Sequence, residues 1–371
     1  MQKFQRLAKW CISLLLLLTA SNLKGADTTG IRAQLAAHRN QLYYPNSVER
    51  FYKSTGFRLA WIAPDTVKTH AWDAMLLLDC VVQYGLDHSD YHPRQLLYPK
   101  LHELIEHPCK SNNRQKALYD ILLTDAVIAF VNNLHYGRLN PEWPAVKIDK
   151  KVTAGFRAEV ILANALNQKD FYSAIISAQP TSASYKSLQY KMHLVTGLYT
   201  GDCYETPESA IRLMAVNLER MRWVNDNVSN FIAINIPSKI LSYYINDTVY
   251  RFKIKSKVGM NMQININEFS VNNGAMLLHV AGNPLNMQIE GRQVLNTDNF
   301  VSVRDAGNLA RLLLNRPVNM YNKKRYKLPK TMPGYTTYYT CEMQNGVLFT
   351  YKDINLQDAK IEKALYHPKA R

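Results

Sequence analysis

The sequence predicts an α+β fold in which an all-helical N-terminal domain precedes a mostly β C-terminal domain with few helices. From Ile31 to Leu198 the apolar residues recur at steps of three and four, which is the period of a helix that buries one face. Past Cys203 the period changes, and after one more helical stretch the chain continues as short alternating runs separated by turn residues, which is typical of strands. The 371 residues suffice for two or three domains, so each half is long enough to bury a core.

Five stretches are predicted to be helices before the pattern changes to strands. Two of them, Trp72–Tyr84 and Gln115–Leu134, are long and strongly apolar. Ala154–Gln168 and Tyr185–Leu198 are further helical stretches. A helix is also expected over Pro207–Met221, because its proline stands at the start, where a missing backbone N–H costs nothing.

The C-terminal half is expected to contain two hairpins and one short helix. Phe231–Ile236 alternates as a half-buried strand does. Lys239–Ile245 and Thr248–Ile254 flank Asn246-Asp247, a two-residue turn signal. The second hairpin is expected from two runs, Tyr335–Met343 and Val347–Tyr351, which flank the turn residues Gln344-Asn345-Gly346. The short helix is expected over Asn308–Leu314.

The N-terminus has the pattern of a secretory signal over residues 1–25. Lys3, Arg6 and Lys9 precede a short apolar core, Cys11–Ala20, and small residues follow it. The apolar run is shorter than the ~20 residues of a membrane span, although an uncleaved anchor is the alternative. We therefore expect export to the periplasm or cell envelope, with membrane contact only through this segment before cleavage. The remaining chain divides into a helical scaffold domain, 26–205, and a β-rich domain, 206–371.

The chain is strongly basic, with a formal net charge of +16. Removing residues 1–25 lowers this charge only to +12, so the excess suggests anionic partners. Nucleic acid is not expected, because the chain is exported and carries no nucleic-acid motif. Lys323-Lys324-Arg325-Tyr326-Lys327 with Lys330 is either a contact for an anionic polymer or a solvated loop.

The cysteines do not predict a metal site, and no cofactor site is expected. Cys80, Cys109, Cys203 and Cys341 follow the signal segment, and their spacing contains no C-x-x-C. In an oxidising compartment Cys80 and Cys109 could form a disulfide. The alternative is that all four cysteines are unpaired thiols.

Several phrases in this order resemble the large periplasmic L,D-transpeptidases, in which a helical scaffold domain precedes a YkuD-type catalytic domain. The resemblance covers roughly 320 residues. The phrases are Phe51-Tyr52, Trp61, Gly85-Leu86-Asp87-His88, Tyr91-His92, Leu123-Thr124-Asp125-Ala126, Tyr136-Gly137-Arg138-Leu139-Asn140-Pro141, Asn217-Leu218-Glu219-Arg220-Met221-Arg222-Trp223, Ile234-Asn235-Ile236-Pro237, Tyr338-Tyr339-Thr340, Asp353-Ile354 and Asp358.

The resemblance implies a catalytic thiolate that this sequence lacks. Family members cross-link peptidoglycan with a Cys whose proton is taken by a His. His279 matches that His, whereas Phe300 stands where the Cys belongs and Ser302 where the motif Arg belongs. A two-residue gap gives the other alignment, in which Ser302 replaces the Cys and Arg304 keeps the Arg. Neither alignment supplies a cysteine.

Two shortened regions point to the same loss of chemistry. Only about thirty residues join Tyr185 to Asn217, where the resemblance implies a small peptidoglycan-binding helical module. Only about twenty residues join Lys257-Val258-Gly259 to His279, where the resemblance implies a long substrate-covering insertion.

We therefore expect a pseudoenzyme of cell-wall metabolism that binds peptidoglycan stem peptides or another envelope protein, with His279 and Arg304 holding a carboxylate. The alternative is an active L,D-transpeptidase-type acyltransferase that uses Ser302 with His279. A third reading is a structural subunit whose scaffold docks another envelope protein.

Overall fold

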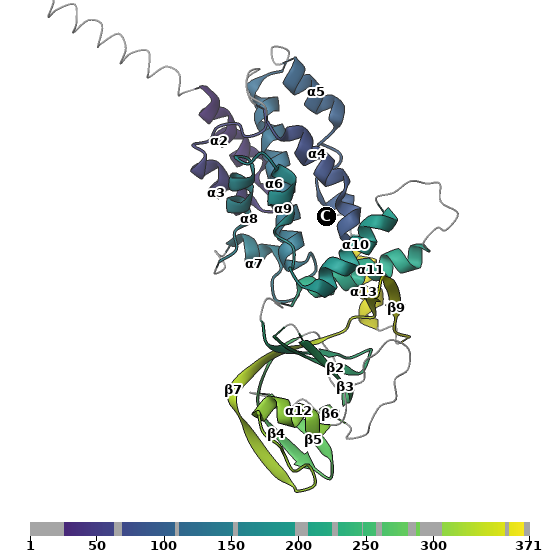
Figure 1. The fold of residues 1–371 in the computed structure, drawn as a ribbon. Coiled ribbons are helices and arrows are strands. Elements are labelled where there is room, and N and C mark those ends of the chain that lie inside the picture. Colours follow the sequence, from purple (N-terminus) through teal and green to yellow (C-terminus); the bar gives the residue numbers. More distant parts are fainter. Residues whose placement is uncertain are drawn as a thin grey trace, which may run out of the picture. The chain divides into compact units, whose positions relative to one another are not determined.

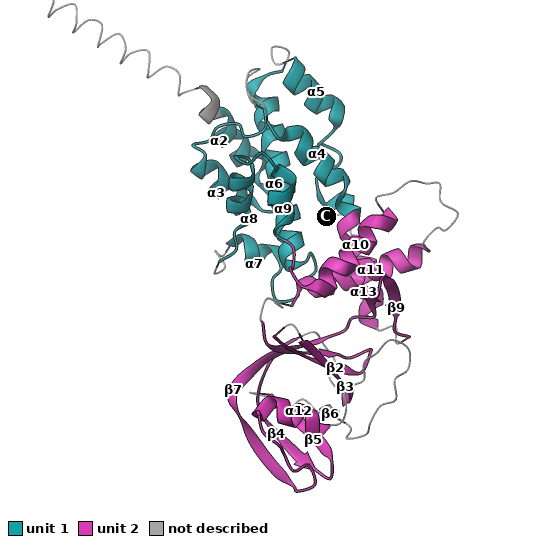
Figure 2. Cartoon of the chain, in the orientation of Figure 1, with its two compact units in different colours: residues 1–82, 87–178 teal, residues 83–86, 179–371 magenta. Residues whose placement is uncertain are grey.

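The computed structural model describes residues 26–62, 69–107, 111–150, 155–196, 207–224, 229–246, 248–256, 262–280, 287–289, 306–352 and 356–366 (Figure 1). The chain forms two compact units (Figure 2). Unit 1 comprises residues 1–82 and 87–178, and unit 2 comprises residues 83–86 and 179–371. The fold is α+β, with helices in the N-terminal half and mostly strands after residue 230, as predicted.

Every regular element of unit 1 is a helix, among the residues that the structure describes. Its α-helices are α2 (Ala26–His38), α3 (Pro45–Ser54), α4 (Ala71–Asp79), α5 (Tyr98–Glu106), α6 (Asn113–Tyr136), α7 (Ala145–Lys150), α8 (Ala158–Ala165) and α9 (Phe171–Ile176). Short 3-10 turns lie at Arg39–Gln41 (η1), Val81–Tyr84 (η2) and His88–Asp90 (η3). The predicted helix Trp72–Tyr84 is therefore wrong as one element, because α4 ends at Asp79 and η2 turns the chain toward Gly85.

Helix α6 is the centre of unit 1, and it confirms the predicted stretch Gln115–Leu134. A capping box of Asn112 and Gln115 begins it, and Gly137, with a φ of 82°, ends it. By length and composition this helix alone, among the described residues, could cross a membrane, but 94% of its apolar window is buried inside the protein. Helix α6 is thus the core helix of a folded unit.

Two buried carboxylates on α6 hold the segments that pack around it. Asp120 accepts hydrogen bonds from the backbone N–H groups of residues 60, 61 and 62 at 2.8–3.1 Å and from the Tyr52 hydroxyl at 2.6 Å. Asp125 accepts from the N–H groups of residues 43 and 44 and contacts His92 Nε2 at 2.7 Å. Thr124 lies between them and accepts from the Trp61 indole. The scattered phrases Phe51-Tyr52, Trp61, Tyr91-His92 and Leu123–Ala126 therefore meet at one helix.

Unit 2 combines helices with a β-barrel. Its helices are α10 (Ala183–Thr196), α11 (Glu208–Arg222), α12 (Ala306–Leu314) and α13 (Leu356–Tyr366). Its strands are β1 (Phe231–Asn235), β2 (Ile240–Ile245), β3 (Thr248–Ser256), β4 (Met262–Asn272), β5 (Ala275–Val280), β6 (Met287–Ile289), β7 (Lys324–Thr337), β8 (Cys341–Gln344) and β9 (Val347–Thr350). The unit takes in α10, which precedes the predicted domain boundary at residue 205.

Seven of these strands close into a barrel of order β1-β2-β3-β6-β5-β4-β7. The pairs are antiparallel except that β1 and β7 run parallel and close the ring. At this closure Gly334 is opposite Ile232, and an added Cβ would lie 2.6 Å from the Ile232 carbonyl oxygen. Only glycine allows the two strands to approach so closely.

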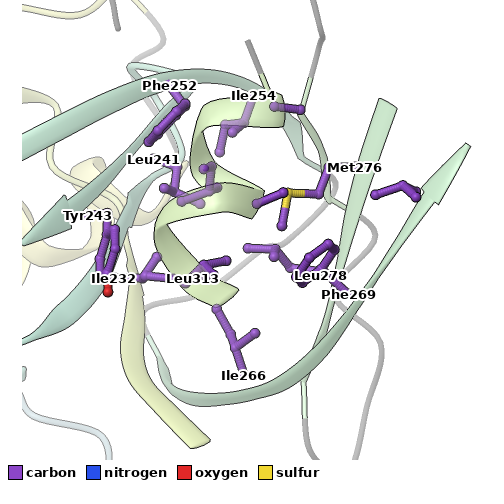
Figure 3. Packing of buried hydrophobic residues seen from close by; sticks show 14 of the residues in the cluster. Ile232, Leu241, Tyr243, Phe252, Ile254, Ile266, Phe269, Met276, Leu278 and Leu313 are labelled. Atoms are coloured by element: carbon purple, nitrogen blue, oxygen red, sulfur yellow. The ribbon is translucent and has the colours of Figure 1, made fainter. Parts of the chain in front are cut away.

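The barrel core is apolar and includes one helix. Residues at alternate positions of β1 to β5 point inward, and the buried face of α12 packs among them (Figure 3). Leu313 on α12 lies in this cluster with Ile232 and Ile266 of the strands. The amphipathic run Asn308–Leu314 is thus confirmed as a helix, and its apolar stripe completes the core.

Helix α11 is tied to the end of the chain by buried polar groups. Asn217 accepts hydrogen bonds from the N–H groups of Thr340 and Cys341, at 2.7 and 3.1 Å. Arg220 pairs with Asp358 of α13 and donates to the Tyr338 carbonyl oxygen at 2.7 Å. The junction phrase and the C-terminal phrases of the sequence therefore come together in unit 2.

The hairpins follow the prediction in part. Strands β2 and β3 pair around Asn246, whose φ of 44° suits a tight hairpin turn. Strands β8 and β9 likewise pair around Asn345 and Gly346, which both have positive φ. The predicted strand Tyr335–Met343 is wrong as one element, because residues 335–337 close the barrel in β7 and β8 begins only at Cys341. The hairpin thus forms a separate two-stranded sheet.

Candidate functional site

His279 is the predicted site residue that the structure describes, and it lies on the outer wall of the barrel. It points outward from β5, since its neighbours Met276 and Leu278 are buried in the core. Ser270 of the adjacent strand β4 places its Oγ 2.5 Å from His279 Nε2. Arg325 of β7 places Nη2 3.4 Å from His279 Nδ1 and 3.2 Å from Glu268 Oε1. We call Ser270, His279, Arg325 and Glu268 the outer-wall cluster.

The hydrogen-bond partners of the His279 imidazole indicate which of its two ring nitrogens carries the proton. A guanidinium only donates hydrogen bonds, so Nδ1 facing Arg325 accepts. In the neutral ring Nε2 then carries the hydrogen and donates it to Ser270 Oγ. Burial, together with the positive charge of Arg325, lowers the pKa of His279, and Glu268 only partly opposes this shift. The ring is therefore neutral at pH 7.

This arrangement is opposite to the one that serine catalysis requires. A general base must present a lone pair to the hydroxyl, and a third group must accept a hydrogen bond from its other nitrogen. Here the nitrogen facing Ser270 donates, and the third group is a cation. The cluster can hold a ligand oxygen near Ser270 and Arg325, but it does not activate Ser270.

The structure does not describe where the other predicted site residues lie relative to His279. Phe300, Ser302 and Arg304 lie outside the described residues, as do Cys109, Cys203 and the signal segment. The two described cysteines do not offer a thiolate in place of the missing one. Cys341 is buried beside the Leu213 carbonyl oxygen, and burial raises its pKa; burial also raises the pKa of Cys80. Both are free thiols that stay protonated at neutral pH.

The basic segment is a strand and not the loop of the solvated alternative. Residues 324–327 belong to β7, where Arg325 and Lys327 stand opposite Ser270 and Glu268 of β4 on the outer face. Tyr326 between them points inward and stacks on Phe269 with ring centroids 5.3 Å apart. The alternation therefore presents Arg325 and Lys327 outward on the wall of the barrel.

The whole barrel shares this charge. Across its described residues between 229 and 337, Glu268 is the single acidic residue, and Arg325 pairs with it. The basic residues over the same positions number eleven: Lys239, Arg251, Lys253, Lys255, Arg311, Arg316, Lys323, Lys324, Arg325, Lys327 and Lys330. Such a surplus gives the surface of the barrel a positive electrostatic potential.

A metal centre has no support among the residues that the structure describes, where no group of three His, Cys, Asp or Glu side chains could hold an ion. The outer-wall cluster of β4, β5 and β7 consists of hydrogen-bonding groups and the ion pair of Arg325 with Glu268. Ser270 is the member that sequence reasoning missed. It is nine residues from His279 and carries no motif, so only the strand register brings it there.

Comparison with known families concerns unit 1 and the beginning of unit 2. Residues 46–192 match the model of the scaffold domain family. The match covers less than half of the chain and ends before the barrel. No curated protein matches the chain. The scaffold part of the resemblance is thus supported, and the YkuD-type part stays a prediction.

Proposed function

We propose that this chain is a non-catalytic protein of the cell envelope, whose barrel binds anionic groups of the cell wall such as the carboxylates of peptidoglycan stem peptides. The observation that carries the proposal is the charge of the barrel. Residues 229–337 contain fourteen Lys and Arg against five Asp and Glu, and eleven against one among the described residues. On β7 the exposed Arg325 and Lys327 lie on the outer face, next to the hydrogen-bond donors of the outer-wall cluster.

The chemistry of the ligand follows from these donors. Arg325 presents a planar fork that matches a carboxylate, and Lys327 adds a point charge two residues along the same face. His279 and Ser270 add neutral polar groups beside Arg325. A polymer that repeats its carboxylates would gain from several such contacts along the wall.

A non-catalytic role is supported by the tautomer of His279 and by the state of the thiols. His279 donates to Ser270, and the Cys341 thiol is buried with a raised pKa. The alternative is an active L,D-transpeptidase-type acyltransferase with Ser302 as its nucleophile. It requires His279 to release the contact with Arg325 and accept a proton, which would cost the hydrogen bonds that now orient the ring.

The test of binding uses residues 26–371 and isolated peptidoglycan sacculi. The double variant Arg325→Gln/Lys327→Gln should lower the sedimented fraction several-fold, because two charges leave the binding face. The loss should shrink as salt rises, since salt screens exposed charges over about 10 Å at 0.1 M. Arg304→Ala extends the test to the residue that the resemblance implies.

A matched control separates this face from net charge alone. Arg114→Gln/Lys169→Gln removes the same charge from exposed positions of unit 1. This control should bind like the unchanged chain, and both double variants should keep its melting temperature. Equal losses in the two double variants would reduce the proposal to non-specific attraction and overturn it.

Catalysis is tested separately by mass spectrometry after incubation with disaccharide-tetrapeptides. We expect neither an acyl adduct nor cross-linked dimers. A product that disappears in Ser302→Ala or His279→Ala would show an acyltransferase with an atypical site and would refute the pseudoenzyme.

A further inference from the structure

An apolar face on α4 and α5 in unit 1 has no role in the proposed binding by the barrel. On α4 the side chains of Trp72 and Leu76 are four residues apart and therefore lie on one face. They are 37% and 57% exposed, although both belong to residue types that normally seek the interior. Tyr98 of α5 stacks on Trp72 with ring centroids 6.0 Å apart, and its neighbour Leu97 is 49% exposed. We call these four residues the α4–α5 face.

The α4–α5 face is held in place by hydrogen bonds. The Tyr98 hydroxyl donates to Asp79 Oδ2 at 2.5 Å, and this contact joins the end of α4 to the start of α5. His88 of η3 approaches the other Asp79 oxygen at 3.3 Å. The aromatic pair is thus positioned in advance, which lowers the entropy that a bound partner would lose.

The charge around this face is opposite to that of the chain. Between residues 69 and 107 there are two basic residues, Arg94 and Lys100. The acidic residues over the same positions number six: Asp73, Asp79, Asp87, Asp90, Glu103 and Glu106. The chain as a whole is +16. This segment is therefore an acidic region on a basic protein, and on α4 the exposed Leu76 lies between Asp73 and Asp79.

We propose that the α4–α5 face docks a basic amphipathic helix of a partner protein. The apolar side of such a helix would cover Trp72, Leu76 and Leu97, and its Lys or Arg residues would meet Asp73 and Asp79. Exposed aromatic and apolar groups with polar surroundings mark protein interaction sites, and aromatic anchors carry much of the binding energy. An amphipathic helix laid on an apolar surface is an established mode of recognition.

The test measures binding of synthetic 18-residue peptides to residues 26–371 by calorimetry. The first peptide repeats Leu and Lys with helical spacing. The second replaces each Lys by Glu, and the third scrambles the Leu/Lys peptide so that it has no apolar side. We expect binding of the Leu/Lys peptide alone, and a loss of about tenfold in the variant Leu76→Ser.

Val160→Ser is the matched control, because Val160 is an exposed apolar residue on α8 of the same unit. It should bind the Leu/Lys peptide unchanged. A benzophenone on the bound peptide should cross-link within residues 72–98. Equal binding of the scrambled peptide, unchanged binding in Leu76→Ser, or no binding up to about 1 mM would each overturn the proposal.

The outcome is independent of the function proposed for the barrel. Leu76→Ser should leave sedimentation with sacculi intact, whereas Arg325→Gln/Lys327→Gln should leave peptide binding intact. Failure of one proposal is therefore distinguishable from failure of the other. Leu76 is largely exposed, so its substitution should not change the melting temperature.

Discussion

Unit 1 and the barrel use charge in opposite ways. Over its described residues unit 1 has as many acidic as basic residues, fourteen of each, and Asp120, Asp125 and Asp149 are buried. Over its described residues the barrel has one acidic residue, Glu268, and its basic residues are mostly exposed. Buried carboxylates organise the chain of unit 1, whereas the barrel is held by its apolar core and strand pairing. Charge therefore contributes to stability in the first region, whereas in the second it is mostly exposed.

The largest effect should follow the loss of a buried carboxylate from unit 1. Asp120→Ala removes the acceptor of the N–H groups of residues 60–62 and of the Tyr52 hydroxyl. Buried donors without partners are costly, so the free energy of unfolding should fall by roughly 4 kcal/mol. Urea unfolding measures it. The control Asp170→Ala, at the exposed N-cap of α9, should cost about 1 kcal/mol. Similar losses in the two variants would contradict the comparison.

Unit 2 also contains buried charges outside the barrel, and the pair of Arg220 with Asp358 sharpens the contrast. Asp358→Ala leaves the fully buried Arg220 without its counter-charge, which should cost about 3 kcal/mol. The double variant Arg220→Met/Asp358→Leu should recover most of that loss, because it removes both buried charges. A double-mutant cycle in urea measures the coupling. Additive losses would show that the two side chains act independently.

The smallest effect on the free energy of unfolding is expected from substituting Glu342 of β8. Its carboxylate accepts hydrogen bonds from Asn235 at 2.5 Å and from Tyr351 at 3.4 Å. Desolvation raises the pKa of Glu342, opposed by Asn235 and by the charge of Arg251. A raised pKa in the folded state gives stability that is present below the unfolded pKa and lost as pH rises through the folded pKa. The neutral variant Glu342→Gln should therefore be more stable than the unchanged chain at pH 7.

That gain should shrink as pH falls toward about 4.3, the ordinary pKa of a glutamate, because Glu342 is then protonated in both states. Urea midpoints along this pH range measure it. Glu268→Gln removes the same charge from the outer wall and serves as the control. A gain that is equal at both ends of the range would contradict a desolvated carboxyl at Glu342.

Local patterns predicted the helices and turns well. The α6 stretch, the α12 stripe and the Asn246 turn depend on neighbours in sequence, so their residues carry the signal. Strand β7 was missed because Pro329, Pro333 and its lysines disfavour a strand by propensity. It forms because β4 and β1 pair with it on both sides, with an irregular register between Ile266 and Glu268. Pairing partners outweigh propensity here.

The site was predictable only in part for the same reason. His279 was found from a motif, but its partners come from two other strands, β4 and β7, whose register no single run of residues encodes. Ser270 and Arg325 stand opposite each other only because β4 shifts its pairing with β7 near residue 267. The basic segment was recognised as charge, while its alternation between the core and the outer face depends on that register.

The closure of the barrel by β1 and β7 also sets an order of events in folding. Ile232 of β1 can pair with Gly334 of β7 only after roughly a hundred further residues have been synthesised, and such non-local contacts slow folding. Until residue 337 has been made, β1 and β4 each keep an edge that β7 will cover, and unpaired edges invite association with other chains. The barrel therefore completes its ring after nearly all of its chain is available, and Gly334 is where its first and last strands meet.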